Sequence, residues 1–259
     1  MSERPSVIVT GAAGGIGAAT ATLLAARDYR VIAADVHEVA DVHDAGDVVR
    51  VRLDVGDPAS WAEVAETVGR SHERLVGLVS NAGIAGPGGV MATSDEAWQQ
   101  VHRVNLDGVF FGMRAIGPLL RDGGGGSIVN VSSAAGLMGY HDVAYASSKW
   151  AVRGLSKSAA AEFARWGVRV NSVHPGLVST PMAGEPGPYV AAHLEAVPLG
   201  EMATAHQVAE TIAFLVGDQS EHITAAEFAV DGGLAGAGTY FAIRNRARTL
   251  RDQRENPDV

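Results

Sequence analysis

The chain has 259 residues, a formal net charge of −9, 47% hydrophobic residues and 19% charged residues. This composition supports a substantial apolar core and argues against nucleic acid as a partner, because phosphate binding requires a basic surface. The chain contains no cysteine, which excludes disulfides, thiolate metal sites and thiol nucleophiles.

The beginning of the chain and its hydropathy predict a cytoplasmic protein. Residues 1–6 lead directly into a short apolar strand and lack the basic region and apolar core of a signal peptide. No apolar run approaches the ~20 residues of a membrane-spanning helix. We expect one domain over residues 1–259, outside any membrane, since α/β sheets of this size commonly form single domains.

The first predicted elements are a β-branched strand at 6–10, a glycine-rich turn at 11–17 and a helix at 18–27. This order can place a pyrophosphate at the N-terminus of a helix. The turn reads Gly-x-x-x-Gly-x-Gly over Gly11, Gly15 and Gly17. The long-chain dinucleotide folds use a different spacing, and an ordinary tight turn is the alternative.

A second strand at 30–34 leads to Asp35, eighteen residues after Gly17. An acidic residue at this point can accept hydrogen bonds from an adenosine ribose and repels a 2′-phosphate. The sequence therefore favours NAD over NADP as the cofactor. A solvated aspartate in a loop is the alternative.

Two further strands, at 48–53 and 75–79, also end in candidate binding residues. Between them, a helix is predicted from Pro58 to about residue 72, because proline is tolerated in a first helical turn. The strands are followed by two groups of residues, Asp54 with Val55 and Asn81-Ala82-Gly83. The small residues after the second strand would let a cofactor ring lie against the backbone.

A long helical pattern at 95–120 contains Asn105. Asparagine is a poor helix former, so this position requires a reason, with a capping or polar-face role as the alternative. Glycines at 123–126 then lead into an apolar strand at 127–132, which is followed by Ser133. A strand end of this kind can hold a hydroxyl beside the next helix.

The next helix, predicted to extend to about residue 166, carries Tyr145 and Lys149. Side chains four residues apart share one face of a helix. A neighbouring cation lowers the pKa of a phenol from its usual value of about 10, which makes the phenol a usable general acid and base. The alternative is a half-exposed aromatic residue beside a solvated charge.

The last third of the chain begins with a strand at 168–174 that leads to Pro175 and Gly176. A proline-containing stretch at 180–204 has no clear period and is interpreted as a flap over the site, or as a plain surface excursion. A helix at 205–216 and a strand at 228–231 follow. Residues 236–259 form an arginine-rich arm that is solvated or contacts another subunit.

The alternation of strands and helices predicts an α/β fold of the Rossmann-like type, a doubly wound parallel sheet of about seven strands with helices on both faces. Ligands of such sheets bind beyond the carboxyl ends of the strands. Six candidate residues fall at such ends: Gly11, Asp35, Asp54, Asn81, Ser133 and Pro175. We therefore expect one nucleotide site.

Taken together, these motifs resemble the short-chain dehydrogenase/reductase family in its compact single-domain branch. The resemblance covers roughly residues 6–233. It rests on the glycine turn that begins at Thr10 and on Asp54, Asn81-Ala82-Gly83, Asn105, Ser133, Tyr145-x-x-x-Lys149, Pro175-Gly176 and Asp231-Gly232-Gly233.

The resemblance implies catalytic roles for four residues. Tyr145 exchanges a proton with the substrate oxygen, and Lys149 lowers the pKa of Tyr145 and binds the nicotinamide ribose. Ser133 orients the carbonyl or alcohol and stabilises negative charge on its oxygen, and Asn105 holds a water that links Lys149 to solvent. Hydride passes between the nicotinamide and the substrate carbon.

The resemblance also implies cofactor contacts. Val178 and Thr180 hold the carboxamide, and Ile16 contributes a backbone contact near the pyrophosphate. Asp54 and Val55 line the adenine pocket. The remaining expected contacts are Gly11, Gly15, Gly17, Asp35, Asn81, Ala82, Gly83, Tyr145, Lys149, Pro175 and Gly176. No metal site is expected.

Three segments, at 132–139, 147–150 and 171–176, resemble bacterial 3α(or 20β)-hydroxysteroid dehydrogenases more narrowly. Ser80 and Ala225 depart from common family residues without removing a catalytic group. The substrate region, at 138–143 and 182–199, is fairly apolar, with Met138, Tyr140, Met182 and Tyr189. His141 and His193 contact substrate in one interpretation and lie on the surface in the other.

The resulting expectation is NAD(H)-dependent oxidation of a secondary alcohol, or reduction of a ketone, on a cyclic and hydrophobic small molecule of the hydroxysteroid type. The alternatives are a 3-oxoacyl carrier-protein reductase, a dihydrodiol dehydrogenase and a catalytically silent NAD-binding sensor. Family resemblance implies a homotetramer built through the helices that contain Asn105 and Tyr145.

Overall fold

The computed structural model describes residues 4–40, 42, 47–70, 74–184 and 187–255. Within these residues, seven parallel strands form one sheet in the order β3-β2-β1-β4-β5-β6-β9. The strands are β1 (Ser6–Thr10), β2 (Arg30–Asp35), β3 (Val48–Arg52), β4 (Leu75–Ser80), β5 (Gly126–Val131), β6 (Val168–Pro175) and β9 (Glu227–Val230).

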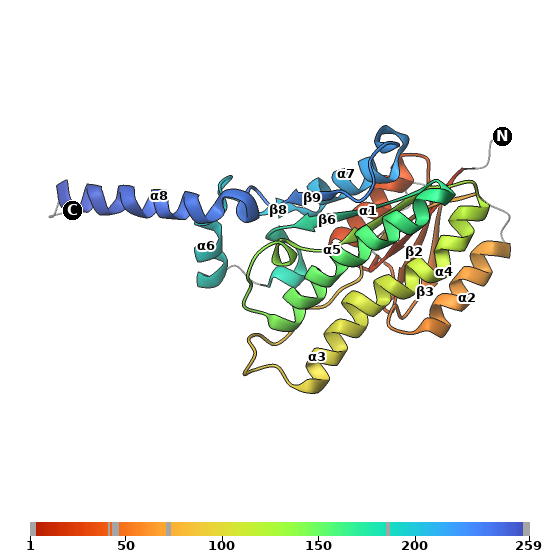
Figure 1. The fold of residues 1–259 in the computed structure, drawn as a ribbon, viewed down its shortest axis with the longest axis horizontal. Helices are drawn as coiled ribbons and strands as arrows, with labels where there is room; N and C mark the ends of the chain where they lie inside the picture. Colours follow the sequence, from red (N-terminus) through yellow and green to blue (C-terminus); the bar gives the residue numbers. More distant parts are fainter. Residues whose placement is uncertain (1–3, 41, 43–46, 71–73, 185–186, 256–259) are drawn as a thin grey trace.

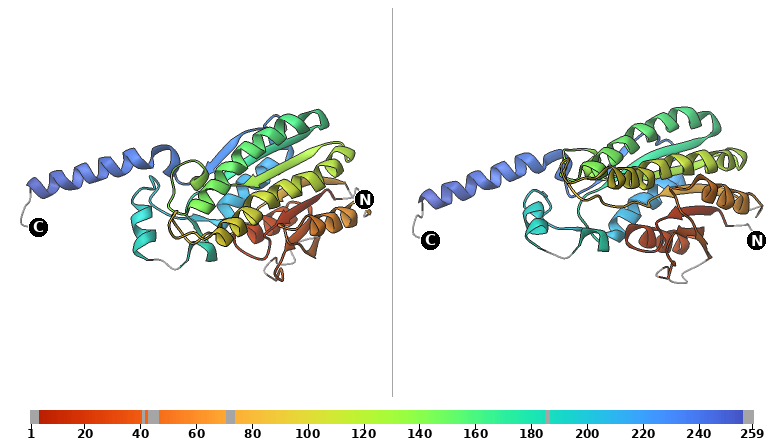
Figure 2. Two further views of the ribbon diagram at one scale, coloured as in Figure 1. Left: turned by 60° about the horizontal axis from the view of Figure 1, so that its bottom comes forward. Right: turned by 90° about the horizontal axis from the view of Figure 1, so that it is seen from below.

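Helices cover both faces of the sheet (Figures 1 and 2). One face packs against α1 (Gly15–Ala26) and α7 (Ala205–Val216), and the other packs against α2 (Pro58–Arg70), α4 (Gly108–Asp122) and α5 (Val143–Phe163). The predicted α/β fold with a parallel sheet is therefore confirmed.

Strand β1 shows why the central strands are continuously apolar. Its alternate residues point to opposite faces, so Val7 and Val9 join the core beneath α1 and α7 while Ile8 joins the core beneath α2, α4 and α5. All three are fully buried. A parallel strand with helices on both sides has no solvated face to carry polar residues.

The order of the strands creates the position of the site. The chain moves from β1 outward to β2 and β3, and then crosses to β4 on the other side of β1. The connections after β1 and β4 therefore leave in opposite directions, and the crevice between them is where sheets of this type bind ligands.

The predicted helix at 95–120 contains an irregularity. It begins as α3 (Asp95–His102), continues through a five-residue π-helical turn at Arg103–Asp107 and resumes as α4. A π-helical turn contains one extra residue and is frequent at functional sites. Asn105 lies inside this turn and is fully buried.

Helix α5 is shorter than predicted. It ends at Phe163, and the last three predicted helical residues, Ala164–Trp166, form a 3₁₀ turn. The helix stops because Gly167 follows in the left-handed conformation, with φ 69°, which glycine adopts without strain.

The predicted flap has more regular structure than its sequence indicated. It contains a short strand pair, β7 (Val178–Ser179) with β8 (Ala203–Thr204), and helix α6 (Pro188–Leu194). Pro188 occupies the first position of that helix, where its missing N–H has no helical acceptor in any case. Prolines that suggested an irregular loop therefore include one that begins a helix.

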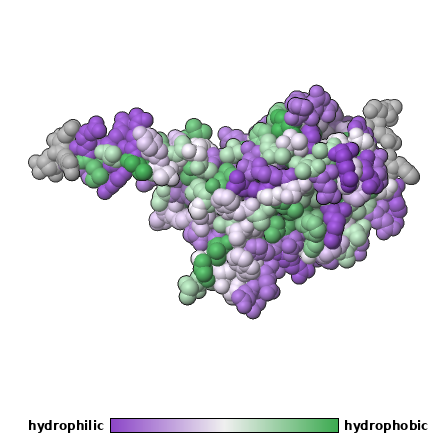
Figure 3. Space-filling view, viewed as in Figure 1, coloured by the Kyte–Doolittle hydropathy of each residue, from purple (hydrophilic) through white to green (hydrophobic). Residues whose placement is uncertain are grey.

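The C-terminal arm is helical. Helix α8 (Leu234–Glu255) is anchored at its first turn and then projects away from the body (Figures 1 and 2). Its surface is largely hydrophilic with scattered hydrophobic side chains (Figure 3), among which Tyr240, Ile243 and Leu250 are exposed. In the described part of the chain, no helix has a stretch that is long and apolar enough to cross a bilayer.

Candidate active site

The glycine turn after β1 is shaped by close backbone contacts. Gly11 and Gly15 have positive φ angles of 67° and 55°, which favour glycine. A Cβ on Gly11 would lie 2.8 Å from the Cα of Ala82, and a Cβ on Gly17 would overlap the carbonyl oxygen of Gly11. The turn and the start of α1 therefore require glycine at these positions for packing.

Polar side chains join the ends of β1 and β4. The Asn81 side-chain amide donates to the Thr10 carbonyl oxygen at 2.9 Å. The backbone N–H groups of Asn81 and Ala82 both donate to the Thr10 hydroxyl oxygen, at 3.0 and 3.1 Å. Asn81 therefore fixes the floor of the crevice between the two strands.

Two aspartates hold the neighbouring strand ends. The Asp35 carboxylate accepts hydrogen bonds from the N–H of Ala13, at 3.0 Å, and of His37, at 2.9 Å. Asp54 accepts one from the N–H of Gly56 at 2.9 Å. Each carboxylate keeps lone pairs for a further donor, and both side chains line the same crevice.

This crevice is part of a cavity of about 750 Å³. Its walls come from the carboxyl ends of β1 to β6 and from the segment that contains β7, η4 (Pro181–Ala183) and α6. Of the sequence-predicted site residues, the following line it: Gly11, Gly15, Ile16, Asp35, Asp54, Val55, Asn81, Ala82, Gly83, Ser133, Tyr145, Lys149, Pro175, Gly176, Val178 and Thr180.

Two predicted residues are not in the cavity wall. Gly17 lies behind the glycine turn, where it packs against Gly11 and the Asn81 amide. Asn105 lies one layer deeper, beneath Gly83. A Cβ on Gly83 would be 3.3 Å from both Asn105 Oδ1 and Lys149 Nζ, so this glycine lets the backbone pass over both side chains.

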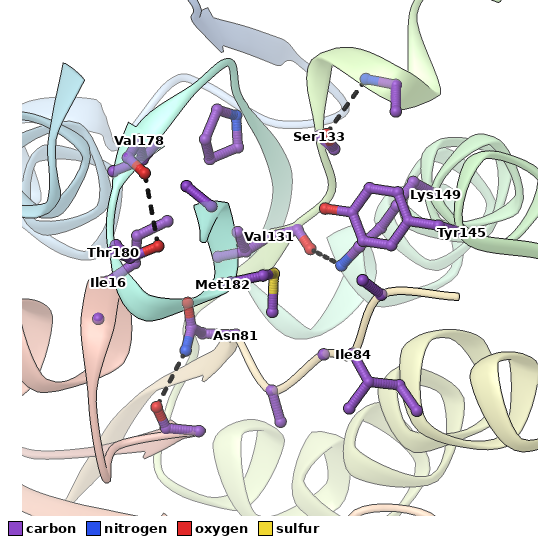
Figure 4. A pocket seen from close by; sticks show the side chains of 18 of the residues that line it. Ile16, Asn81, Ile84, Val131, Ser133, Tyr145, Lys149, Val178, Thr180 and Met182 are labelled. Atoms are coloured by element: carbon purple, nitrogen blue, oxygen red, sulfur yellow. Dashed lines mark hydrogen bonds between the residues drawn. The ribbon is translucent and has the colours of Figure 1, made fainter. Parts of the chain in front are cut away.

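Tyr145 and Lys149 face the cavity from the same side of α5 (Figure 4). The Lys149 ammonium lies 5.6 Å from the centre of the Tyr145 ring and donates to the Val131 carbonyl oxygen at 2.9 Å. Burial lowers the pKa of Lys149 to about 8, because a buried ammonium loses its hydration. Its charge is therefore held at the end of β5 by one carbonyl.

Burial raises the pKa of the Tyr145 phenol, against a hydrogen bond with Ser133 that lowers it. The net direction differs from the lowering that was expected from Lys149. Desolvation of the phenolate dominates, while the ammonium points toward Val131. Burial therefore favours the protonated phenol of Tyr145 in this structure, beside Ser133 in the same cavity.

Ser133 is oriented by two neighbours. Its hydroxyl accepts a hydrogen bond from the N–H of Ala135 at 3.1 Å, which caps the 3₁₀ turn Ala134–Gly136. Its carbonyl oxygen lies 3.1 Å from Nδ1 of His174. Burial lowers the pKa of His174, which favours its neutral form. Through its contact with Ser133 this imidazole connects β6 with the end of β5.

Asn105 is fully bonded to the backbone of the loop after β4. Its Oδ1 accepts from the Ile84 N–H at 2.8 Å, and its Nδ2 donates to the Ile84 carbonyl oxygen at 2.9 Å and to the Ser148 hydroxyl at 3.2 Å. The π-helical turn thus places the Asn105 amide where it exchanges two hydrogen bonds with the Ile84 backbone, as a residue of a neighbouring strand would.

Asp142 is a site residue that the sequence interpretation missed. It is buried and caps the N-terminus of α5, where it accepts from the Tyr145 N–H at 3.0 Å. Its second oxygen accepts from the Gly86 N–H at 2.6 Å. An aspartate three residues before Tyr145 is a helix N-cap signal, so the cap was recognisable, whereas the bond to Gly86 was not.

The substrate end of the cavity is formed by Met138, Tyr140, His141, Met182 and Tyr189. His193 also lines it, and its Nε2 is buried without a hydrogen-bond partner. Burial lowers the pKa of His193. Both histidines therefore belong to the cavity wall, although the ring of His141 is also accessible to solvent.

The shape of the crevice fits a dinucleotide. Backbone at Gly11, Gly15 and Gly83 approaches the cavity without side chains, the ends of β2 and β3 present two carboxylates, and the volume lies within the usual range of ligand sites. Figure 4 shows Val178 and Thr180 across the cavity from Tyr145 and Lys149. A nicotinamide between them would thus have a polar wall on one side and a phenol on the other.

Comparison with known proteins gives consistent results. Residues 11–235 match the family described as enoyl-(acyl carrier protein) reductase. A 3-alpha-(or 20-beta)-hydroxysteroid dehydrogenase of Mycobacterium tuberculosis is 39% identical over 87% of this chain and 87% of its own. A cis-4-hydroxycyclohexanecarboxylate dehydrogenase of Sinomonas cyclohexanicum is 41% identical over 90% of this chain and 96% of its own.

Among solved structures, levodione reductase superimposes with a TM-score of 0.85, at 28% identity, over 90% of this chain and 98% of its own. The family match ends at residue 235, so α8 lies almost entirely beyond it. The match covers the segments that directly follow β1 to β6 and line the cavity. The chain therefore belongs to the short-chain dehydrogenase/reductase family and is an oxidoreductase that acts on CH–OH groups.

Proposed function

We propose that the protein oxidises a secondary alcohol on a cyclic, hydrophobic substrate, or reduces the corresponding ketone, with NAD(H) as the cofactor. The observation that carries this proposal is the Tyr145–Ser133 pair, which lies in one cavity with Lys149 and the strand ends of the dinucleotide crevice. A sensor that only bound the nucleotide would not require these buried polar groups.

Tyr145 serves as the general acid and base. Because its pKa is raised, the phenol holds its proton at neutral pH and can give it to the oxygen of a ketone. Alcohol oxidation requires the opposite transfer, so its rate should rise with pH as the phenolate becomes available. Ser133 is placed to donate a hydrogen bond to the same substrate oxygen and to stabilise its developing charge.

Lys149 and Asn105 support this proton transfer. The Lys149 ammonium has two donors besides the one that it gives to Val131, and these can bind the ribose of the cofactor. Asn105 fixes the loop at Ile84, and Gly83 lets the backbone pass close to both the Asn105 amide and the Lys149 ammonium. We propose that a water beside this amide carries protons from Lys149 to solvent.

The remaining residues hold the cofactor, which supplies the hydride acceptor or donor when bound. Gly11, Gly15 and Ile16 bind the pyrophosphate, and Val178 and Thr180 bind the carboxamide. Asp35 accepts hydrogen bonds from the adenosine ribose, and its negative charge excludes a 2′-phosphate. This charge is our reason for proposing NAD over NADP.

The proposed substrate class rests on the relatives. The names of the relatives from Mycobacterium tuberculosis and Sinomonas cyclohexanicum refer to hydroxyl groups on a steroid and on a cyclohexane ring. The substrate end of this cavity, with Met138, Met182 and three aromatic rings, has a matching apolar character. A carrier-protein reductase of the NADPH-dependent kind fits Asp35 less well.

We further propose a homotetramer that is assembled through α4 and α5. Both helices expose large apolar side chains, Phe110 on α4 and Trp150 on α5, at 43% and 46% of their surface. Light scattering would measure the molar mass, and hence the oligomeric state, of the wild type and of Phe110→Glu. A monomeric wild type would contradict the proposal.

The test of the function is an initial-rate screen with NAD⁺ and NADP⁺ against hydroxysteroids, cyclohexanols, dihydrodiols and 3-hydroxyacyl thioesters. We expect NAD⁺-dependent turnover of cyclic secondary alcohols. Turnover confined to thioesters with NADP⁺ would overturn both the substrate class and the role of Asp35. Tight NADH binding without turnover of any alcohol would favour the sensor.

A further inference from the structure

A row of aromatic rings leads from Tyr145 to helix α6. The Tyr140 ring lies 6.3 Å from that of Tyr145, His141 lies 4.5 Å from Tyr140, and Tyr189 of α6 lies 5.3 Å from His141. All four line the cavity. We refer to Tyr140, His141 and Tyr189 as the distal cluster, because Tyr145 marks the reacting end.

The distal cluster has more hydrogen-bond donors than it uses. The Tyr189 hydroxyl lies 3.3 Å from that of Tyr140 and 3.2 Å from Nδ1 of His141. Two phenols and an imidazole carry at least three protons, and these two contacts employ two of them. The contact between the two hydroxyls is also longer than the ~2.7–2.8 Å of a typical O–H···O bond. One proton therefore remains for an outside acceptor, whichever way the hydroxyls turn.

The proton that remains can be that of Tyr140. In the contact as described, Tyr189 donates and Tyr140 accepts, which leaves the Tyr140 hydroxyl free to donate. Burial, followed by the hydrogen bond with Tyr189 and by nearby charges that include Asp142, raises the pKa of Tyr140. This phenol therefore stays protonated and remains a donor.

The charges around the cluster favour an uncharged acceptor. Among the described residues that line the cavity, Lys149 is the one lysine or arginine, and its ammonium is bonded to Val131. Asp142 follows His141 in the chain, is buried and also lines the cavity. An anionic group here would meet a like charge and no cation, which costs binding free energy.

We propose that the distal cluster binds a second, uncharged oxygen substituent of a cyclic substrate, a hydroxyl or carbonyl remote from the reacting carbon, and that it disfavours a carboxylate there. This inference rests on the proposed function, because it assumes that the reacting alcohol lies at Tyr145. Since Tyr189 comes from α6, this short helix contributes to substrate selection as well as covering the cavity.

The test compares kcat/KM for cyclohexanol, cyclohexane-1,4-diol and 4-hydroxycyclohexanecarboxylate with NAD⁺ at pH 8.5, where free histidine is neutral. We expect the wild type to prefer the diol over cyclohexanol about tenfold and to use the carboxylate least. Tyr140→Phe and Tyr189→Phe should each lower the ratio of the diol to cyclohexanol, Tyr140→Phe by up to about tenfold, as for one lost hydrogen bond.

The ratio removes effects on chemistry, because any disturbance of Tyr145 acts on both alcohols. Tyr240→Phe, on the exposed part of α8, is the matched control and should leave the ratio unchanged. An unchanged ratio in both cluster variants, or a wild type that prefers the carboxylate to cyclohexanol, would overturn the inference alone. A wild type that oxidises no cyclic secondary alcohol, neither these three nor those of the screen above, would overturn the proposed function and this inference with it.

Discussion

The cofactor half of the cavity is built from strand ends that hydrogen bonds join to one another, whereas the substrate half is built from a loop and a short helix that meet through side chains. In the first half, Asn81 and Thr10 connect β1 with β4 at 2.9 to 3.1 Å. In the second, Tyr189 reaches Tyr140 and His141 at 3.2 to 3.3 Å.

This difference in construction suits the two halves to different roles. Strand ends within a seven-stranded sheet cannot shift without disturbing the core, so they suit a constant ligand such as a dinucleotide. A helix of seven residues that meets its neighbours through long polar contacts can be altered at little cost to the fold. Reaction type and substrate choice are therefore held by separate parts of the chain.

The largest effect is expected where the two halves meet, at Tyr145. Tyr145→Phe should lower kcat by about 10³-fold or more, since general acid–base catalysis contributes 10²–10⁴-fold. The cofactor half does not depend on this hydroxyl, so NADH affinity should change by less than about threefold. Steady-state kinetics and a fluorescence titration with NADH measure the two. A parallel loss of NADH binding would show that the halves are not separable.

Asp142 should give the next largest effect, because it holds the start of α5 against the loop after β4. Asp142→Asn retains one acceptor oxygen for two backbone donors, so we expect kcat to fall about 10- to 100-fold and stability to fall by about 1–3 kcal/mol. KM for the cofactor should change little.

Ser94→Ala is the matched control for Asp142, since Ser94 caps the exposed start of α3 with a single bond to Ala97, at 3.2 Å. It should lower stability by about 1 kcal/mol and leave kcat alone. Denaturant unfolding and kinetics on the two variants distinguish a residue that only caps a helix from one that also positions Tyr145. Equal kinetic effects in both would contradict the positioning role.

Asp35 tests the cofactor half by itself. Asp35→Ala should narrow the preference for NAD⁺ over NADP⁺ by about tenfold, because it removes a charge that repels a 2′-phosphate. The diol-to-cyclohexanol ratio should stay the same, since the distal cluster is at the other end. The measurement is kcat/KM for both cofactors, and an unchanged cofactor ratio would refute the ribose assignment.

Lys149 is tested through the stability of the fold, apart from its role in turnover. Its pKa falls from 10.5 to about 8 on burial, so the unfolded chain binds more protons than the folded one between these values, and stability rises with pH there. Lys149→Met should therefore be more stable than the wild type by about 2–3 kcal/mol at pH 7, and this gap should close toward pH 10.

Urea unfolding at pH 7, 8.5 and 10 measures the gap. Lys157→Met is the control, since the Lys157 side chain is half exposed beside Glu227 and its loss should change stability little. A gap for Lys149→Met that stays constant over this range would mean that the ammonium is not destabilised by burial.

The cofactor half of the site was more predictable from the sequence than the substrate half. Strand ends with Gly11, Asp35, Asn81 and Ser133 were predictable because a parallel sheet brings all carboxyl ends of its strands to one edge. The direction of the Tyr145 pKa shift was not predictable. It depends on how deeply the phenol is buried, and the spacing of four residues between Tyr145 and Lys149 carries no information about burial.

The substrate half was less predictable for a physical reason. The contact of Tyr189 with His141 joins residues 48 apart in the chain, and no period relates them. The bond from Gly86 to Asp142 spans 56 residues in the same way. The helical character of α6 was hidden because a first-turn proline resembles a loop proline until the following residues are seen in space.

The π-helical turn at Arg103–Asp107 has a consequence for how this chain tolerates insertions and deletions. A π-helical turn accommodates its extra residue by widening locally, so the helices on either side keep their relative orientation. Deleting one residue from the turn would restore an unbroken α-helical ladder but shift Asn105 away from the Ile84 backbone groups that it contacts at 2.8 and 2.9 Å. Relatives should therefore gain or lose residues on either side of this helix far more readily than within it.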